Sequence, residues 1–299
     1  MKIDPYKNTQ NYLSWKDKNK GFIHGITNEN SSLILQYLGD MEKGINIANG
    51  SVKGARSHCR LRSIKSRLIF FSKKFKELYN LDNIVQINED QLMGFFSEMR
   101  SGIIKRINGQ NFTSPADYVK DMKAFWHWYQ KTSKKKGIII SDITVDLDTS
   151  KDKPKWVYLT EEQIRQLSDN AKFEYRVIIM FLFDTGARAP SELMNIKVSD
   201  LSNDFKELNI RDEVSKTFGR TIKLKLCSSL IKEHIELNDL TSEDYLFTKK
   251  IGDKKKPIQP AAFNKYLRAL SKNLFGDKES PAREKYSKFT SSSFFHPNL

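Results

Sequence analysis

The chain has 299 residues, which is enough for two domains that each bury a core of their own. Hydrophobic residues make up 38% of it and charged residues 29%, a balance that is typical of globular proteins and excludes a disordered chain. With 51 Lys and Arg against 36 Asp and Glu, the formal net charge is +15, and such an excess favours a polyanionic partner, nucleic acid above all.

Helices are predicted through the first part of the chain, at residues 30–41, 51–79, 88–100 and 115–131. In the second of these, apolar residues recur at spacings of three and four and form a core stripe: Leu61, Ile64, Leu68, Phe71, Phe75 and Leu78. The last helix carries a similar stripe that we also assign to the core: Val119, Met122, Phe125, Trp126 and Tyr129. We therefore expect residues 1–135 to form a small all-α domain.

The remaining faces of the 51–79 helix carry a strong positive charge, with Glu77 as the one acid. A solvated helix face is the ordinary interpretation of such a run, and the alternative is a lysine-rich protein whose charge only keeps it dispersed. The imbalance favours instead a surface that faces phosphates. Five of these cations are the expected DNA contacts: Arg56, Arg60, Arg62, Lys65 and Arg67.

Residues 136–155 are rich in Lys, Asp, Ser and Thr and predict a linker. A second domain is expected over residues 156–299, where Thr160 and Gln163 fit a capping box at a helix start. Short strands at 208–210 and 221–226 and helices at 229–236 and 260–274 follow. The predicted fold class is therefore mainly α with a small antiparallel β-sheet.

The segment with the clearest chemistry follows the apolar run 177–183, which predicts a buried helix that Gly186 ends. Arg188 lies two residues after this glycine and four residues before Glu192. An arginine at the end of a buried helix needs a carboxylate partner, an anionic ligand, or both. This need makes Arg188 the strongest functional candidate in the chain.

Phosphate chemistry fits this arginine and two of its neighbours in the sequence. A phosphodiester under attack gathers charge on its non-bridging oxygens, which a two-pronged guanidinium stabilises. Glu192 lies close to Arg188, and Lys216 falls in the turn between the two predicted strands. A lysine with a lowered pKa can protonate the leaving 5′-oxygen, although a turn lysine is ordinarily only a solvated charge.

The cysteines and the longest apolar runs indicate where the protein acts. Cys59 and Cys227 lie far apart without a Cys-x-x-Cys pattern, so neither a disulfide framework nor a zinc site is expected. Apolar runs fall short of the ~20 residues that cross a membrane, and the N-terminus lacks the apolar core of a signal peptide. We expect a cytoplasmic protein that does not contact the membrane.

Residues 177–201 resemble the first catalytic box of the tyrosine recombinases, the phage and archaeal integrases. That box reads Thr-Gly-x-Arg and then Ser-Glu-Leu, and the chain has Thr-Gly-Ala-Arg-Ala-Pro-Ser-Glu-Leu, with one residue more than most members between the arginine and Ser-Glu. The resemblance implies that Arg188 is the first active-site arginine, Glu192 the acid near it, and Asp200 a structural acid that closes the box. The 214–220 segment resembles the family's hairpin, which makes Lys216 the catalytic lysine. The N-terminal half is similar to the family's DNA-clamping core-binding domain.

The C-terminal end departs from the family pattern. The second box reads Thr-x-His-x-Leu-Arg-His, and residues 290–296 fall in register with it. Ser292 then stands at the first His, Phe295 stands at the second arginine, and only His296 agrees. The chain stops at Leu299, before the family's nucleophilic tyrosine, so we expect a truncated or frameshifted copy with an incomplete catalytic domain.

The resemblance implies site-specific DNA recombination and integration, in which strands are cleaved and rejoined through a 3′-phosphotyrosine link. It implies no metal and no nucleotide cofactor, double-stranded DNA as the partner, and a homo-oligomer, a tetramer, on that DNA. The alternative is a catalytically inactive DNA-binding protein that occupies recombination sites or assembles with an active homologue. A basic RNA-binding protein is a third possibility, which leaves the placement of Arg188 unexplained.

Overall fold

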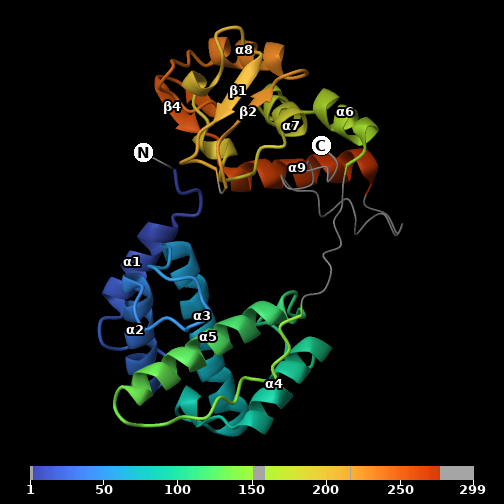
Figure 1. Cartoon of the computed structure of the whole chain (residues 1–299). Helices are drawn as coiled ribbons and strands as arrows, with labels where there is room; N and C mark the ends of the chain where they lie inside the picture. Colours follow the sequence, from blue (N-terminus) through green and yellow to red (C-terminus); the bar gives the residue numbers. More distant parts are fainter. Residues whose placement is uncertain (1–2, 151–158, 216, 277–299) are drawn as a thin grey trace. The chain divides into compact units, whose positions relative to one another are not determined.

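The computed structural model describes residues 3–150, 159–215 and 217–276. Within these residues the chain divides into two compact units (Figure 1). A helical unit takes in residues 7–150, and a mixed unit takes in residues 3–6 together with 159–276. Helices predominate, and the strands pair only in two small antiparallel sheets, which confirms the predicted fold class.

The helical unit contains five α-helices, α1 to α5, and one short 3-10 helix. Their bounds are α1 Asn8–Lys18, α2 Asn28–Lys43, α3 His58–Tyr79, the 3-10 helix Ile84–Gln86, α4 Glu89–Ser101 and α5 Pro115–Lys134. Local chemistry sets several of these ends. The side chains of Thr27 and Ser57 accept backbone N–H groups at the starts of α2 and α3, and Asn88 with Gln91 forms a capping box at α4.

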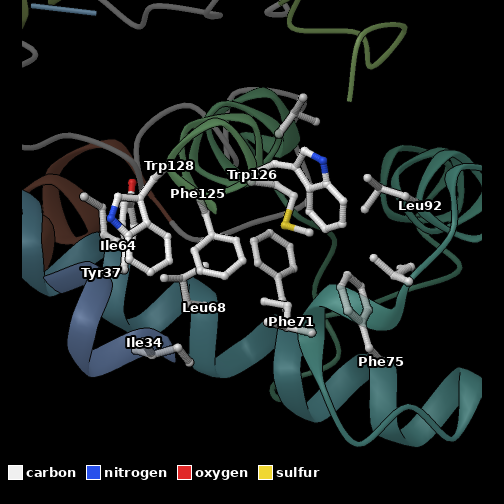
Figure 2. Packing of buried hydrophobic residues seen from close by; sticks show 14 of the residues in the cluster. Ile34, Tyr37, Ile64, Leu68, Phe71, Phe75, Leu92, Phe125, Trp126 and Trp128 are labelled. Carbon is white, nitrogen blue, oxygen red and sulfur yellow. The ribbon is translucent and has the colours of Figure 1, made fainter. Parts of the chain in front are cut away.

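The core of this unit follows the predicted stripes closely (Figure 2). Five of the six stripe residues on α3 are buried, but Leu78 is 42% exposed, so its assignment to the core was wrong. The stripe turns to Tyr79 in the last helical turn, where the Tyr79 hydroxyl donates to the Gln91 carbonyl at 3.1 Å. Trp128 lies outside the predicted stripe yet is buried, because its ring packs against Tyr37 and Phe125, and its Nε1 donates to Asp40 at 2.8 Å.

The mixed unit alternates helices and short strands. Its elements are α6 Glu161–Asp169, α7 Phe173–Thr185, the 3-10 helices Leu193–Asn195 and Val198–Asp200, β1 Glu207–Ile210, β2 Arg220–Lys223, α8 Ser228–Leu237, β3 Thr248–Ile251, β4 Lys254–Pro257 and α9 Pro260–Phe275. β1 pairs with β2 in a register that sets Ile210 opposite Arg220. The β3–β4 hairpin was not predicted, because its lysine-rich, mostly exposed strands carry little apolar alternation.

Helix α7 forms the buried centre of this unit, as its apolar run predicts. Gly186 ends it in the left-handed conformation, with φ at 57°. Asp184, in its last turn, accepts the backbone N–H groups of Lys225, Leu226 and Cys227 at 2.9, 2.8 and 3.1 Å. These bonds take the chain out of the β-ladder, so the second predicted strand ends at Lys223 rather than at residue 226.

Two segments lie elsewhere than the sequence analysis places them. Residues 3–6 group with the mixed unit, where the Ile3 backbone bonds to the Asn195 side chain in both directions, at 2.6 and 3.0 Å. Part of the predicted linker packs on the helical unit, with Leu147 buried and Ser141 accepting from Trp126 Nε1 at 2.9 Å. Within the described residues, every helix is too short or too polar to span a membrane.

Candidate active site

The loop after α7 closes on itself between Arg188 and Glu192. The Glu192 N–H donates to the Arg188 carbonyl at 2.8 Å, and the Arg188 N–H donates to Glu192 Oε2, also at 2.8 Å. Thr185 supports the loop from the helix end, because its Oγ1 accepts the Ala187 N–H at 3.1 Å. Backbone groups of the loop therefore hold the Glu192 carboxylate in place independently of contacts from other side chains.

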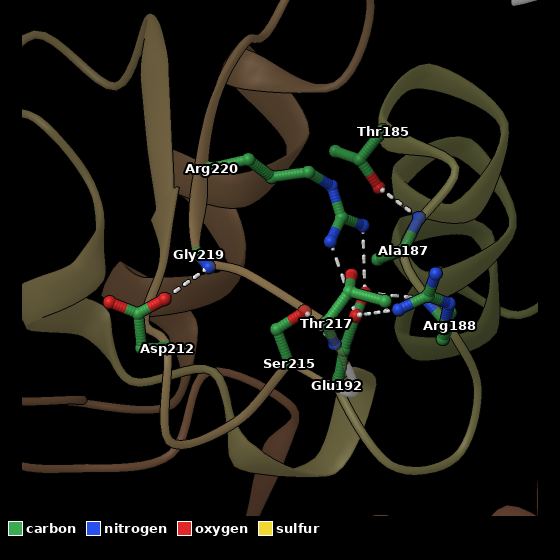
Figure 3. A network of polar contacts seen from close by, with 9 residues as sticks. All are labelled: Thr185, Ala187, Arg188, Glu192, Asp212, Ser215, Thr217, Gly219 and Arg220. Carbon is green, nitrogen blue, oxygen red and sulfur yellow. Dashed lines mark hydrogen bonds and ion pairs between the residues drawn. The ribbon is translucent and has the colours of Figure 1, made fainter.

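Two guanidinium groups converge on this carboxylate (Figure 3). Arg220, the first residue of β2, places Nη1 3.2 Å from Oε1 and Nη2 2.8 Å from Oε2. Arg188 places Nη1 3.3 Å from Oε1. The Glu192 side chain is 0% exposed, whereas the side chains of Arg188 and Arg220 are 41% and 34% exposed. The carboxylate is therefore the hidden centre of a site whose outer surface consists of two guanidinium groups.

The sequence analysis required a carboxylate partner or an anion for Arg188, and Glu192 is that carboxylate. The arginine itself differs from the expectation, because its side chain reaches solvent although the helix before it is buried. The buried charge at this helix end belongs to Glu192. Its two oxygens accept four donors, which fills the acceptor capacity of an ionised carboxylate.

The protonation state of Glu192 follows from these contacts. Burial raises the pKa of the Glu192 carboxyl. Hydrogen bonds from Arg220 and from the Arg188 N–H, together with the two guanidinium charges, lower that pKa by more, so it lies below its ordinary value. The group is thus ionised at neutral pH and has no role as a proton carrier. It orients the two arginines.

Asp200 has a structural position. Its Oδ2 accepts the Lys197 N–H at 2.8 Å, and its Oδ1 lies 2.8 Å from Nε of Arg211. Arg211 in turn donates from Nη2 to the Asn195 carbonyl at 2.8 Å. These contacts tie the segment after Glu192 to the end of β1.

Hydrogen bonds within the β1–β2 connection hold its described residues close to β1. The Gly219 N–H donates to Asp212 Oδ1 at 2.6 Å, and the Thr217 N–H donates to Ser215 Oγ at 3.3 Å. Gly219 is required here, because a Cβ at this position would lie 2.7 Å from the Ile210 carbonyl oxygen. Lys216 itself lies outside the described residues, as do Ser292, Phe295 and His296 of the predicted second box.

The sequence analysis missed Arg220. It treated residues 211–220 as a turn and assigned no role to the cation that starts β2. One available signal was its position, since it is a cation directly before the predicted strand 221–226. Within the described ranges, no group of three or more His, Cys, Asp and Glu side chains is placed to hold a metal ion.

The five cations expected to contact DNA all belong to the helical unit, and each has a partner there. Arg60 and Arg67 form ion pairs with Asp121, which is 1% exposed. The other three make looser contacts: Arg56 with the Val52 carbonyl, Arg62 with Asn8, and Lys65 with the ring of Trp15. At least Arg60 and Arg67 therefore serve to neutralise a buried acid as well as to present charge.

A groove of about 1360 Å³ opens on the helical unit beside these residues. Arg56 and Arg60 line one part of it, and four lysines of α5 line another: Lys120, Lys123, Lys131 and Lys134. Its described lining contains no Asp and no Glu. The α5 lysines were not among the predicted DNA contacts, because the sequence analysis used that helix only for its aromatic core stripe.

Comparison with known proteins adds a family and a fold. Residues 157–284 match the phage integrase family, and no curated protein is similar enough in sequence to match. The Tn1549 transposon integrase in complex with a circular intermediate DNA is 14% identical, with 88% of this chain and 83% of that chain covered and a TM-score of 0.58. XerH site-specific recombinase bound to its difH substrate is 16% identical, with 98% and 83% covered and a TM-score of 0.54. A lambda integrase tetramer bound to a Holliday junction is 11% identical, with 96% and 79% covered and a TM-score of 0.57. At these identities the likeness shows a shared fold.

Proposed function

Because residues 157–284 match the phage integrase family, we propose that the chain acts on double-stranded DNA as a site-specific recombinase of the tyrosine type. The observation that carries the proposal is the pair of part-exposed guanidinium groups held on the buried Glu192. Two arginine side chains that are held in place at the same part of the surface are suited to bind a phosphate. They bind its oxygens by charge-assisted hydrogen bonds. We place the reaction in the cytoplasm, without metal or nucleotide.

In the proposed reaction the family's tyrosine, which is not among the residues assigned here, loses its hydroxyl proton to solvent as its oxygen attacks the phosphorus. A 3′-phosphotyrosine bond forms, and the bond to the 5′-oxygen breaks. Arg188 stabilises the charge that develops on the non-bridging oxygens. Lys216 donates a proton to the leaving 5′-oxygen, which becomes a hydroxyl. His296 is assigned to the same phosphate by its place in the second box. The phosphotyrosine bond retains the free energy of the broken bond, so that a second 5′-hydroxyl can rejoin the strand.

For the helical unit we propose a role in gripping the duplex through its basic groove. The groove combines six cations from α3, the segment before it and α5 with a described lining free of carboxylates. Contacts from such side chains go to phosphates and give affinity without sequence preference. Arg56 and Arg60 line this groove, and Arg62, Lys65 and Arg67 belong to α3 outside its lining. Asp121 partly offsets the charge of Arg60 and Arg67.

Duplex binding measured over a series of salt concentrations tests the DNA part of the proposal. The observed association constant should fall steeply with salt, since each neutralised phosphate contributes about −0.9 to the slope of log K against log salt. Replacing Lys120 and Lys134 together by Gln should lower that slope, whereas Lys105→Gln, an exposed lysine of the same unit outside the groove, should leave it within error. A flat salt response of the unaltered chain rejects the DNA-clamp proposal.

A DNA-binding protein that does not cut is the second candidate. It is favoured by one sequence observation, the Phe295 that stands where the second arginine of the family pattern is expected. A duplex with a nick beside the cleavage point separates the two, because it traps a covalent protein–DNA product. If that product forms with a version of the chain extended to carry the family's tyrosine, and not with Arg188→Ala in the same version, the recombinase is supported. If the extended version binds the duplex and no product forms, the second candidate stands.

We also propose that four copies assemble on DNA. The support is indirect: a lambda integrase of similar fold is a tetramer on a Holliday junction. Mass measurement of complexes with a synthetic four-way junction should give four protomers per junction. Complexes that saturate at one or two protomers contradict the tetramer without affecting the proposed chemistry.

A further inference from the structure

The sequence analysis assigned no role to Arg220, and its geometry gives it more than a supporting part. We infer that Arg220 binds the phosphodiester together with Arg188, so that the site holds its phosphate between two guanidinium groups. The inference rests on the proposed function, since it concerns the same phosphate. The inference goes beyond the proposed function because Arg220 belongs neither to the first catalytic box nor to the residues already assigned to the reaction.

The donors of Arg220 are only partly used within the protein. A guanidinium carries five N–H donors, and the contacts with Glu192 engage one from Nη1 and one from Nη2. The side chain is 34% exposed, so the outer edge of the group reaches solvent. The same holds for Arg188. Its side chain makes one contact with Glu192 and is 41% exposed. Both arginines therefore keep donors for an anion while the carboxylate behind them holds their orientation.

Charge balance gives the stronger argument. Arg188 and the ionised Glu192 alone sum to zero, and a neutral ion pair offers little attraction to a phosphate. With Arg220 the three side chains sum to +1, from two guanidinium groups and one carboxylate. A phosphodiester carries −1, so it neutralises the trio. Without Arg220, the buried carboxylate would cancel the charge that Arg188 is proposed to supply.

The position of Arg220 in the fold also fits a contact with substrate. It begins β2 directly after Gly219, whose tight approach to Ile210 fixes where the strand starts. Figure 3 shows its side chain extending from β2 toward the carboxylate that Arg188 contacts from the α7 loop. Two separate segments of the chain thus deliver guanidinium groups to one point, and each is anchored by its own backbone.

A purely structural role for Arg220, which neutralises Glu192, is the competing explanation, and a pair of variants separates the two. Glu192→Gln removes the charge that a structural Arg220 would serve. In that background a structural arginine is no longer needed, so Glu192→Gln and the double variant Glu192→Gln/Arg220→Gln should share one salt slope of duplex binding. If Arg220 contacts phosphate, the double variant should have a slope smaller by about 0.9, the contribution of one phosphate contact.

The matched control is Arg165→Gln, which removes the same charge from an arginine that is 70% exposed on α6 and paired with Glu161. Its slope should equal that of the unaltered chain. Arg220→Lys should keep most of the slope and lose affinity, because it retains the charge without the planar fork. Thermal melting of each variant confirms that the unit is folded.

The outcomes distinguish this inference from the proposed function. A flat salt response of the unaltered chain rejects the DNA proposal itself. A steep response, with equal slopes for Glu192→Gln and Glu192→Gln/Arg220→Gln, leaves the DNA proposal standing and overturns the role of Arg220. A drop of about 0.9 in the double variant, with no change in Arg165→Gln, supports it.

Discussion

Arg220 and Glu192 meet through two parallel contacts, Nη1 to Oε1 at 3.2 Å and Nη2 to Oε2 at 2.8 Å, which join the start of β2 to the loop after α7. This geometry is the strongest form of an arginine–carboxylate contact. It also explains how a fully buried acid is tolerated at this point, since an unpaired carboxylate would cost several kcal/mol. The candidate site and the stability of the mixed unit therefore depend on the same side chain.

Glu192→Ala should destabilise the mixed unit strongly. The change leaves two arginines without their shared acceptor and opens a cavity, and breaking a buried ion pair costs about 3 kcal/mol or more in the free energy of unfolding. Urea unfolding followed by circular dichroism gives the value. Glu161→Ala, at an acid whose side chain is 67% exposed in its pair with Arg165, is the control and should cost at most about 0.5 kcal/mol. Equal losses in the two variants would contradict the assigned importance of Glu192.

Asp121→Asn should weaken the helical unit and tighten its binding to DNA. Asp121 is 1% exposed and accepts ion pairs from Arg60 and Arg67, so its neutral replacement removes their counter-charge. We expect a loss of about 2 kcal/mol in the free energy of unfolding, as for hydrogen bonds to charged groups. Duplex affinity at low salt should rise, because two cations beside the groove lose their acid. Unchanged affinity would show that Arg60 and Arg67 do not face DNA.

The sequence predicts the helical unit better than the site, for a physical reason. Helix stripes such as Leu61 to Phe75 are periodic, and caps such as Thr160 with Gln163 depend on neighbours in the sequence. The partners of Arg60, Arg67 and Arg220 lie 61, 54 and 28 residues away, where no local pattern reaches. A run of cations in the sequence thus predicts a positively charged surface. It does not show which of these cations pair with a buried acid.

Gly219→Ala should displace the start of β2. A Cβ at this position would lie 2.7 Å from the Ile210 carbonyl oxygen and 3.0 Å from the Asp212 nitrogen, both of them backbone atoms. Overpacking of this kind costs about 1–3 kcal/mol, and the shift should also move Arg220 and lower duplex affinity. Gly94→Ala in the middle of α4, where a Cβ meets nothing within 4 Å, is the matched change and should stabilise its unit by about 0.5–1 kcal/mol. A tolerated Gly219→Ala would mean that the turn can relax.

Asn195→Ala should release the N-terminal segment from the mixed unit. The Asn195 side chain accepts from the Ile3 N–H at 2.6 Å and donates to the Ile3 carbonyl at 3.0 Å and the Ser191 carbonyl at 2.9 Å. Its loss should lower the stability of the unit by about 1–3 kcal/mol, because part-buried backbone groups lose their partners. A chain that starts at residue 7 should lose less stability than Asn195→Ala does. Combined with Asn195→Ala, the shortened chain should lose less than the sum of the two changes; strict additivity would show that the contact contributes nothing.

His234 should make the mixed unit less stable below neutral pH. It is 0% exposed on α8, with Nε2 3.0 Å from the Leu246 carbonyl, and burial lowers its pKa against smaller opposing effects from that carbonyl and the charge of Glu174. An unfolded histidine titrates at about 6.5, so below this pH the unfolded chain binds a proton that the folded unit does not. The free energy of unfolding should then fall by at most about 1.4 kcal/mol per pH unit until the pH passes the lowered folded pKa. Urea unfolding at about pH 7.5 and about pH 5.5 should show this loss in the unaltered chain and a smaller one in His234→Gln. His24→Gln, at an exposed histidine of the helical unit, should leave the loss unchanged, and the same loss in all three proteins would rule out His234 as its source.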